Sequence, residues 1–342
     1  MTEQIRILVA RPPERMRLDA YLARELAPEY SRSQILKAIR AGLVVMNERP
    51  ARAADAIRAG DRIALHIPAP AAPAMASAPA PPVDVLHEDA DLIFVNKAPG
   101  MAVHPSPGHP HSTLVDALVA RFPDLASVIE LDGTWRAGIV HRLDKDTSGV
   151  MVVARDSFAR AALSDQFRRR TVEKIYIALV AGHLGAERMT IDRPIGRHQT
   201  ERRRMSVKSA TGREAQSEVT VIGRCHLPLP RGEAMPVSVV AVRPRTGRTH
   251  QIRVHLASSG HPCLGDPLYC RSARARLALE RQALHALYLA VDHPRRAERV
   301  SAIAPVAPDL AELLAACGFR SGELERQLIG ALKAAWPASP PV

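Results

Sequence analysis

The stretch HRLDKDTSG, residues 141–149, lies between two short apolar runs at 137–140 and 150–154. Both runs are rich in aliphatic and β-branched residues, which predicts two buried strands joined by a polar loop. A plain hairpin turn needs only Gly, Asn or Asp, whereas this loop carries two carboxylates and three basic side chains. We therefore interpret it as a loop that holds reacting groups on a rigid scaffold. For Asp146 an alternative is kept, in which the side chain only bonds the backbone of its own turn.

Strand patterns dominate the chain from residue 83 onward, and helical patterns are few. The predicted strands are 92–96, 137–140, 150–154, 174–181 and 237–242, and the predicted helices are 156–169 and 249–258. This mixture predicts an α+β fold built on a mixed, largely antiparallel sheet.

Residues 1–67 carry a separate pattern. Apolar residues recur at helical spacing at positions 18, 21, 22 and 26, and again at 35, 36 and 39. Ser31 is placed to cap the second helix, and Gly42 is placed to end it. Strand patterns at 43–46 and 62–67 complete a compact unit of two helices and a hairpin.

The clearest boundary in the chain is an Ala/Pro-rich stretch at 68–82, which has no helical or strand periodicity. Such a composition predicts a semi-rigid extended linker. We therefore divide the chain into a small module at 1–67, the linker at 68–82, a large domain at 83–336 and a disordered tail at 337–342.

The composition of the 342 residues points to a polyanionic partner. Lys and Arg number 47 against 35 Asp and Glu, which gives a formal charge of +12 and favours nucleic acid ahead of an anionic membrane. No apolar run is long enough for a membrane span or a signal peptide, so we expect a cytoplasmic protein. The four cysteines form no Cys-x-x-Cys pair, and we expect them to be reduced structural thiols.

Two classes of enzyme are disfavoured by the motifs. A nucleotide-dependent enzyme would need a phosphate-binding glycine loop, and neither common form is present. A metalloenzyme is suggested by 14 histidines, but His250 and His255 would lie about 140° apart on a helix, and no His-Glu-x-x-His occurs. We therefore expect neither a metal nor another cofactor.

Four segments agree with one known family, in the same order along the chain. They are NKAPG at 96–100, the HRLDKDTSG stretch, KIYIALV at 174–180, and TGRTHQIRVHL at 246–256 followed by GHP at 260–262 and GDPLY at 265–269. Together they resemble the RluA-type pseudouridine synthases, and most closely the RluD-like branch that acts on large-subunit ribosomal RNA. In that family the first segment normally reads Asn-Lys-Pro-x-Gly, so this chain exchanges two neighbouring positions.

The N-terminal module also carries a resemblance. RLDAYL at 17–22, SRS at 31–33 and GLV at 42–44 are similar to the αL RNA-binding module of the S-four type, named after a small-subunit ribosomal protein. Such modules present their second helix and hairpin to folded RNA. The expected Val-Asn-Gly turn reads Met46-Asn47-Glu48 here, which leaves its geometry open.

The family resemblance assigns roles to individual residues. It implies that Asp144 is the catalytic residue, that Arg253 is its partner, and that Tyr176 stacks on the uracil. Whether Tyr176 also handles the C5 proton or only positions the base stays open. Helical spacing supports Arg253, because it places His250, Arg253 and Ala257 on one stripe. For Tyr176 the alternative is an ordinary core tyrosine. The expected substrate-binding residues are His141, Arg142, Lys97, Arg248, His250 and Gln251.

Several exposed basic positions are predicted to bind RNA phosphates. They are Arg17, Arg32, Lys37 and Arg40 in the module and Arg197, Arg202, Arg203 and Arg204 in a basic loop. A charge run of this kind is also compatible with a merely solvated surface.

The chemistry implied by the resemblance needs little more than a carboxylate. Pseudouridine forms when the uracil leaves the ribose C1′ through N1 and rejoins it through C5. An aspartate can attack C1′, or it can remove a ribose proton to give a glycal, and the sequence leaves both routes open. The uridine must first leave its stack, and His141 and Arg142 are candidates to fill the gap.

We therefore expect a monomeric RNA pseudouridine synthase without an obligate protein partner, acting on large-subunit ribosomal RNA; another ribosomal RNA or a transfer RNA stays open. The alternative is a non-catalytic RNA-binding ribosome assembly factor, for which Asp144→Asn would be harmless.

Overall fold

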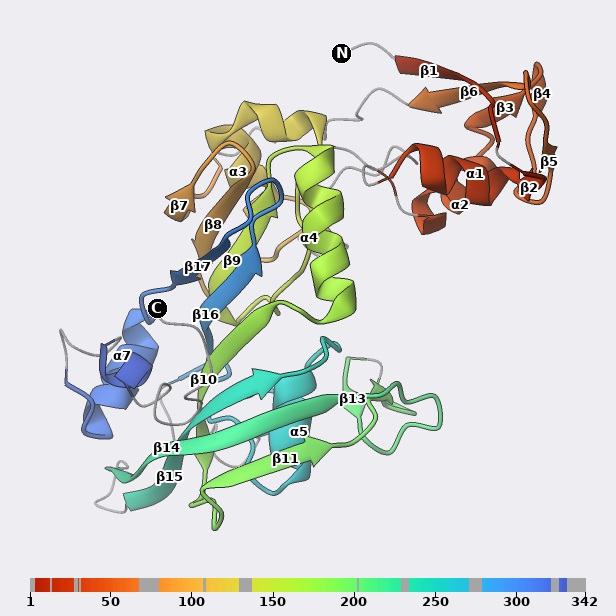
Figure 1. The fold of residues 1–342 in the computed structure, drawn as a ribbon. Helices are drawn as coiled ribbons and strands as arrows, with labels where there is room; N and C mark the ends of the chain where they lie inside the picture. The colour runs from red at the N-terminus through yellow and green to blue at the C-terminus, as the bar shows by residue number, and fades with distance from the viewer. Residues whose placement is uncertain are drawn as a thin grey trace.

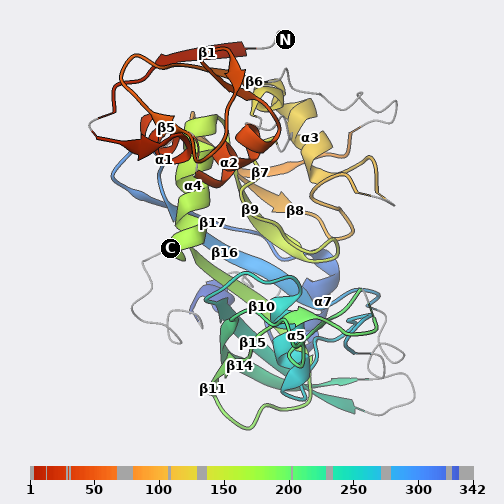
Figure 2. The ribbon, with the colours of Figure 1, turned by 90° about the vertical axis from the view of Figure 1, so that its right-hand side faces the viewer.

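The computed structural model describes two folded units with separate sheets (Figure 1, Figure 2). The described residues are 4–12, 14–27, 30, 32–67, 80–106, 109–128, 137–201, 203–228, 234–270, 279–320 and 326–330. Most of the expected linker and all of the expected tail lie outside these ranges, as do Ser31 and Arg202. Within the described ranges no helix is long and apolar enough to cross a membrane.

The N-terminal unit packs two helices against a small sheet. The helices are α1 (Leu18–Glu25) and α2 (Arg32–Arg40). The sheet has the order β1 (Gln4–Val9), β6 (Arg62–Ile67), β3 (Val44–Met46) and β4 (Arg49–Pro50), while β2 (Met16–Arg17) pairs with β5 (Ala56–Ile57). Both predicted helices and both predicted strands are confirmed.

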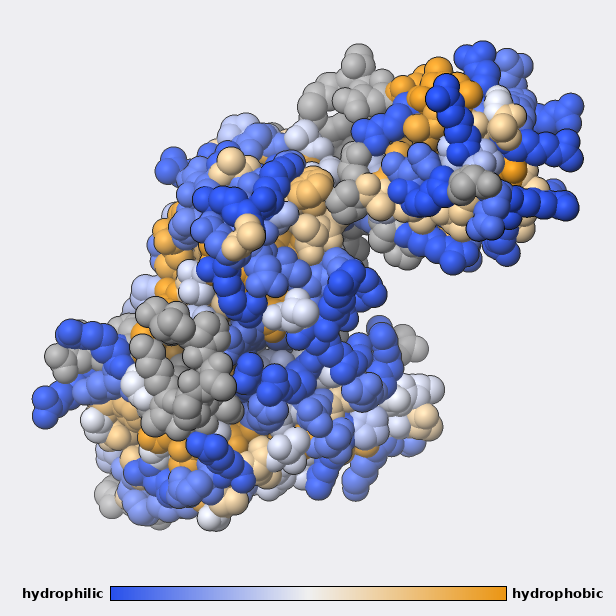
Figure 3. Space-filling view, in the orientation of Figure 1, coloured by the Kyte–Doolittle hydropathy of each residue, from blue (hydrophilic) through white to orange (hydrophobic). Residues whose placement is uncertain are grey.

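Strand β1 was not predicted. Its apolar residues Ile5, Ile7 and Val9 alternate with Arg6 and Leu8, and each of the three is more than half exposed, at 55%, 56% and 55%. Figure 3 shows this apolar strip on the surface of the N-terminal unit. The strand therefore contributes little apolar surface to the core of this unit.

The turn between β3 and β4 adopts left-handed geometry at both central residues. Asn47 has φ 49° and Glu48 has φ 63°, where the related modules carry a glycine. Asn47 fixes the turn, because its side-chain oxygen accepts the Arg62 N–H at 2.9 Å and its amide donates to Asp61 at 2.8 Å. The turn therefore forms without the expected glycine.

The large unit is built on one nine-stranded sheet. Along the sheet the order is β11 (Arg188–Asp192), β14 (Gln216–Pro228), β15 (Ala234–Pro244), β10 (Glu173–Ala181), β16 (Leu284–Asp292), β9 (Ser148–Ala154), β8 (Leu92–Lys97) and β7 (Asp84–Glu88), with β17 (Arg299–Ile303) also paired to β16. Among the strands of this sheet, only β16 and β9 run parallel. The predicted α+β fold with a largely antiparallel sheet is confirmed.

Helices cover the sheet at two separate hydrophobic cores. One core lies under α3 (Leu114–Arg121), the 3₁₀ helix η1 (Pro123–Ser127) and α4 (Ser157–Arg169), packed on β8 and β9. A second core lies where α7 (Pro308–Ala316) packs on β10, β15 and β16. Helix α5 (Gln251–Ser258) packs on β14 and β15, and so brings the predicted arginine to the middle of the sheet.

Residues 137–140 are not a strand, contrary to the prediction. Ala137 and Gly138 both have left-handed backbones, with φ 43° and 74°, and only Ile139 forms a bridge, to Val153. The reason is a close crossing: a Cβ added at Gly138 would lie 1.9 Å from the Ala154 carbonyl oxygen. The polar loop is therefore held by β9 on one side and by a tight turn against the same strand on the other.

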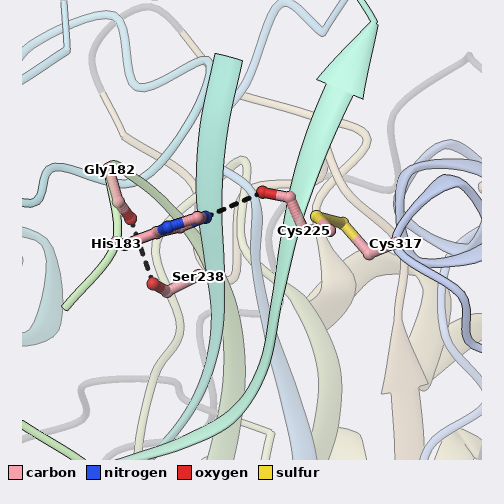
Figure 4. Close-up of a disulfide and its surroundings, with 5 residues drawn as sticks. All are labelled: Gly182, His183, Cys225, Ser238 and Cys317. Carbon is pink, nitrogen blue, oxygen red and sulfur yellow. Dashed lines mark hydrogen bonds between the residues drawn. A yellow bond between two sulfur atoms is a disulfide. The ribbon is translucent and has the colours of Figure 1, made fainter. Parts of the chain in front are cut away.

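Two further expectations need correction. Helix α5 begins at Gln251 rather than at residue 249, because His250 has a left-handed backbone with φ 56°. Cys225 and Cys317 form a disulfide between β14 and the end of α7, shown in Figure 4, although reduced thiols were expected. Their Cα atoms are 5.2 Å apart but 92 residues separate them in sequence, so spacing gave no hint. Cys263 and Cys270 are buried free thiols.

Candidate active site

The polar loop 141–147 opens into a cavity of about 530 Å³. Its walls come from five places that are distant in sequence: the loop, the end of α4 with the start of β10, Arg213, the segment 243–253 that leads into α5, and Leu284 of β16. Figure 3 shows that the face on which α4 ends is largely hydrophilic and is hollowed between α4 and the strands below it. The fold therefore collects three of the four quoted segments around one opening.

Asp144 is the carboxylate of this cavity. Its Oδ2 accepts a hydrogen bond from Nη1 of Arg253 at 2.9 Å, across 109 residues of sequence. The Asp144 side chain keeps 22% of its surface exposed, so a ligand can reach it. Its neighbours Leu143 and Thr147 are buried, which fixes the loop on both sides. The predicted pairing of Asp144 and Arg253 is present in the structure.

Arg253 is itself held by a second carboxylate. Its Nε and Nη2 donate to the two oxygens of Asp266 at 2.7 and 2.9 Å, and Asp266 is completely buried. Burial alone would lower the pKa of Arg253, but the hydrogen bonds and charge of Asp266, together with Asp144, raise it overall. The guanidinium is therefore a permanent, immobile cation beside Asp144.

Asp266 was missed as a functional residue, although its segment was quoted for the resemblance. Its Oδ1 also accepts the backbone N–H groups of Leu268 and Tyr269, at 2.9 and 3.0 Å. A signal was available, because an arginine placed on a buried helix face requires a carboxylate partner.

Tyr176 reaches the cavity from β10. It is half-buried and packs against two neighbouring hydrophobic cores, one that includes β8 and β9 and one that includes α5. Burial, and secondarily the charge of Asp144, raise the pKa of its phenol, so the hydroxyl is protonated in the free protein. The alternate residues Ile175, Ile177 and Leu179 pack into the core under α7 instead.

His250 and Tyr269 form a second contact with the ion pair. The His250 Nε2 lies 3.9 Å from Asp144 Oδ2, and its Nδ1 lies 3.1 Å from the Tyr269 hydroxyl. Burial lowers the pKa of His250, although the charge of Asp144 opposes this effect. The Tyr269 ring lies 5.3 Å from the Arg253 guanidinium carbon and so packs on the cation. Tyr269 was not predicted as a site residue.

His141 was expected to touch the substrate, but it supports the loop instead. The His141 Nε2 accepts the Val152 N–H at 3.0 Å, and the ring stacks on Phe167 with centroids 4.5 Å apart. Burial lowers the pKa of His141 to about 3, so the ring is neutral, as its acceptor role requires. Although His141 borders the cavity, its ring is already committed to these contacts.

Lys97 does not line the cavity, contrary to the expectation. It is completely buried, and its Nζ donates to the carbonyl oxygens of Ala98, Met101 and Lys145 at 2.8, 3.0 and 2.8 Å. Burial lowers the pKa of Lys97 to about 7. Its three donors are used by the backbone, so it joins the 98–101 segment to the catalytic loop rather than binding a ligand.

The remaining residues that were expected to bind substrate differ in how many of their hydrogen-bonding groups are already used. The Gln251 amide is saturated, because its oxygen accepts from Thr246 and the Arg248 N–H while its nitrogen donates to Gln216 and Ser217. Arg248 donates through Nε to the Glu214 carbonyl oxygen at 3.0 Å. Arg142 is exposed at the cavity.

Positive charge dominates the cavity wall. Among the described residues it is lined by nine lysines and arginines and by one carboxylate, Asp144. The nine are Arg142, Arg168, Arg170, Lys174, Arg213, Arg243, Arg245, Arg248 and Arg253. Six of these were not predicted as site residues, because β10, the end of α4 and the segment 213–245 approach the loop only in the folded sheet.

The predicted RNA-binding residues lie away from the cavity walls. Arg17 and Arg32 both bind Asp19, at 3.0 and 2.7 Å, while Lys37 and Arg40 are exposed on α2. Arg197 and Arg203 are exposed beside the short hairpin of β12 (Gly196–Arg197) and β13 (Met205–Ser206). Arg204 pairs with Glu201 and packs on the Tyr269 ring at 5.3 Å, which links this hairpin to the site.

One group among the described residues has the composition of a metal site. Asp89, Asp91 and His293 lie together, but Arg295 and Arg296 already bind the two carboxylates. None of the three lines the cavity. The group is therefore satisfied as an ion-pair network.

Comparisons with known proteins agree with this geometry. The family model for RNA pseudouridylate synthase matches residues 91–258, and the S4 domain model matches residues 16–63. An uncharacterized RNA pseudouridine synthase of Chloroflexus aurantiacus is 44% identical over 89% of this chain and 91% of its own. The ribosomal large subunit pseudouridine synthase D of Xylella fastidiosa is 42% identical, covering 88% of each chain.

A solved structure gives the same result. Human RNA pseudouridylate synthase domain containing 1 superposes with a TM-score of 0.56 at 30% identity, covering 75% of this chain and 98% of its own. The predicted resemblance is thereby confirmed for both units. The chain belongs to the RNA pseudouridine synthases, a family of isomerases, and carries an S4 domain at its N-terminal end.

Proposed function

We propose that this chain converts selected uridines of large-subunit ribosomal RNA to pseudouridine, with Asp144 acting at the ribose of a flipped-out uridine. The observation that carries the proposal is one accessible carboxylate, held at 2.9 Å by a buried arginine, in a cavity otherwise lined by cations. A polyanionic substrate fits such a wall, and an ionised carboxylate fits the reaction.

Asp144 acts on the ribose of the target uridine. The reaction breaks the N1–C1′ bond and forms a C5–C1′ bond, without oxidation and without phosphate transfer. Asp144 either attacks C1′ or takes a ribose proton, and both routes start from the same ionised oxygen. Arg253 holds that oxygen in a fixed orientation, because Asp266 prevents the guanidinium from turning away.

The target uridine must leave its helix before C1′ can meet Asp144. Arg142 is exposed beside the cavity, and a guanidinium plane can stack on the bases that the uridine leaves behind. His141 is unsuited to that part, since its ring is held by Val152 and Phe167. We therefore propose that Arg142 alone fills the space that the uridine leaves in the base stack. We also propose that the Tyr176 ring stacks on the extruded uracil.

The choice of RNA rests on the relatives and on the N-terminal unit. Proteins of Xylella fastidiosa, Xanthomonas campestris and Neisseria meningitidis that are 37–42% identical to this chain are named ribosomal large subunit pseudouridine synthase D. The S4 domain match supports binding to structured RNA. A ribosomal substrate also implies that the protein works in the cytoplasm, where ribosomes are assembled.

The test is to map carbodiimide-resistant uridines in ribosomal RNA from cells with and without this protein. Loss of one or more marks in large-subunit RNA is expected when the protein is absent. Wild type and Asp146→Asn should restore the marks, whereas Asp144→Asn should not. Asp146 is the matched control, because it lies in the same loop and undergoes the same chemical change. Restoration by Asp144→Asn would instead support a non-catalytic assembly factor.

A further inference from the structure

Lys174 is the only lysine on the cavity wall, and its ammonium group has no carboxylate partner within the described residues. It lies on β10 two residues before Tyr176, so both side chains lie on the same face of the strand. The recorded hydrogen bond of its Nζ is a long one, to the Thr246 carbonyl oxygen at 3.5 Å. Two of its three donor positions are therefore available to a ligand.

Five of the eight other cations around the cavity are paired with a carboxylate. Arg253 is bound by two carboxylates, Arg170 pairs with Glu214 at 2.9 Å, and Arg243 pairs with Glu173 at 3.4 Å. Arg142 is exposed, so water solvates its charge. Lys174 is enclosed instead, and burial lowers its pKa to about 8. An enclosed ammonium without a counter-charge is costly, which indicates that its partner arrives with the substrate.

The position of Lys174 relative to Asp144 indicates which part of the substrate this partner is. With the ribose C1′ at Asp144, we place the base along β10, because Asp144, Tyr176 and Lys174 all line the same cavity. The next side chain on that face of the strand is Lys174. A stretch of two residues spans about 7 Å, which is within reach of the far edge of a uracil.

The chemistry of the first step supplies the missing negative charge. When the N1–C1′ bond breaks, its electron pair leaves with the uracil and spreads onto the two carbonyl oxygens. Preorganised donors have their largest effect where charge develops in the transition state. We propose that Lys174 donates a hydrogen bond to a uracil carbonyl oxygen and stabilises the departing base as an anion. Lys174 keeps its proton throughout, and the inference rests on the function proposed above.

The test compares Lys174→Met with wild type in single-turnover reactions at saturating RNA. The rate is expected to fall about 100-fold, the usual effect of losing one such donor, while the Kd for RNA changes less than about threefold. Lys174→Arg, which retains a cation, should recover part of the rate. Lys208→Met is the matched control, since Lys208 is exposed and does not line the cavity. Circular dichroism confirms folding, and Lys174→Gln replaces the Met variant if that one is unstable.

A second substrate distinguishes the base from a phosphate as the partner of Lys174. RNA with 5-fluorouridine at the target position carries a better leaving group, because fluorine withdraws charge from the departing base. Consumption of the modified nucleoside should therefore depend less on Lys174 than consumption of uridine does. Equal losses with both RNAs, or a loss in affinity alone, would overturn the inference. If wild type consumes neither substrate, the proposed function fails instead, so the two failures can be told apart.

Discussion

The two units of this protein arrange three charged groups in opposite ways. In the N-terminal unit one buried carboxylate, Asp19, is shared by Arg17 and Arg32, which are 55% and 56% exposed. In the cavity one buried cation, Arg253, is shared by the buried Asp266 and the accessible Asp144. In each trio the shared buried residue holds the side chains of the other two in place, and the accessible residues face the solvent. The accessible members are two cations in the N-terminal unit and one carboxylate in the cavity.

The largest expected effect is at the accessible member of the catalytic trio. Asp144→Ala should lower the rate of pseudouridine formation by at least about 10⁴-fold, because no other carboxylate lines the described cavity. RNA affinity and the thermal midpoint should stay close to wild type. Tritium release or nucleoside analysis of a single-turnover reaction measures the rate, and filter binding measures affinity. Measurable product from this variant would break the assignment.

The next largest effect is expected at Asp266, the buried carboxylate of the same trio. Asp266→Asn removes the charge that holds Arg253, so the Asp144 oxygen loses its fixed orientation and the rate should fall about 100-fold. Asp124→Asn is the control, because Asp124 also accepts two hydrogen bonds from an arginine, Arg155, and neither residue lines the cavity. Single-turnover kinetics of both variants, with their thermal midpoints, decide the matter. If Asp266→Asn reacts as fast as the control variant, Asp266 is needed only for packing.

The N-terminal trio should affect binding rather than chemistry. Removal of residues 1–67 is expected to raise the Kd for structured RNA by about 10- to 100-fold and to make it less dependent on salt, because phosphate contacts are lost. The rate on saturating RNA should change less than about threefold. Titrations at several salt concentrations, beside single-turnover assays, provide both quantities. Comparable losses in affinity and rate would contradict this division of labour.

The smallest effect is on the acid stability of the N-terminal unit. Burial raises the pKa of Asp19, but its hydrogen bonds and charge interactions with Arg32 and Arg17 outweigh this and lower the pKa overall. A lowered folded-state pKa gives stability that is present above the unfolded value of about 3.9 and is lost as the pH falls through the folded value. Denaturant unfolding between pH 5 and pH 2 should show this loss. Asp19→Asn should flatten that part of the profile; an unchanged slope would remove Asp19 as its cause.

The sequence predicted those parts of the molecule in which local pattern and final contacts agree. Strand β10 and helix α4 form nearly where expected, because apolar alternation and an Asp156 cap are local signals. Strand β16 was missed, since eight of its nine residues are buried and such a strand shows no alternation. Residues 137–140 were misassigned because strand propensity says nothing about the close crossing at Gly138.

The site shows the same limit. Asp144 and Arg253 were predictable from ordered motifs, but the roles of Lys97 and His141 depended on which backbone groups would surround them. The contribution of Lys174 and of the arginines around the cavity arises from the packing of distant strands. The Cys225–Cys317 disulfide likewise joins residues 92 positions apart, which only the folded sheet brings together.

The buried ammonium of Lys97 has a consequence for the catalytic loop. It ties the carbonyl oxygen of Lys145, next to the catalytic aspartate, to a segment 48 residues earlier. Lys97 ends β8 and pairs with Gly149 of β9, so this hydrogen bond depends on the pairing of the two strands. The shape of the loop that carries Asp144 therefore depends on the packing of a segment that lies far from it in sequence.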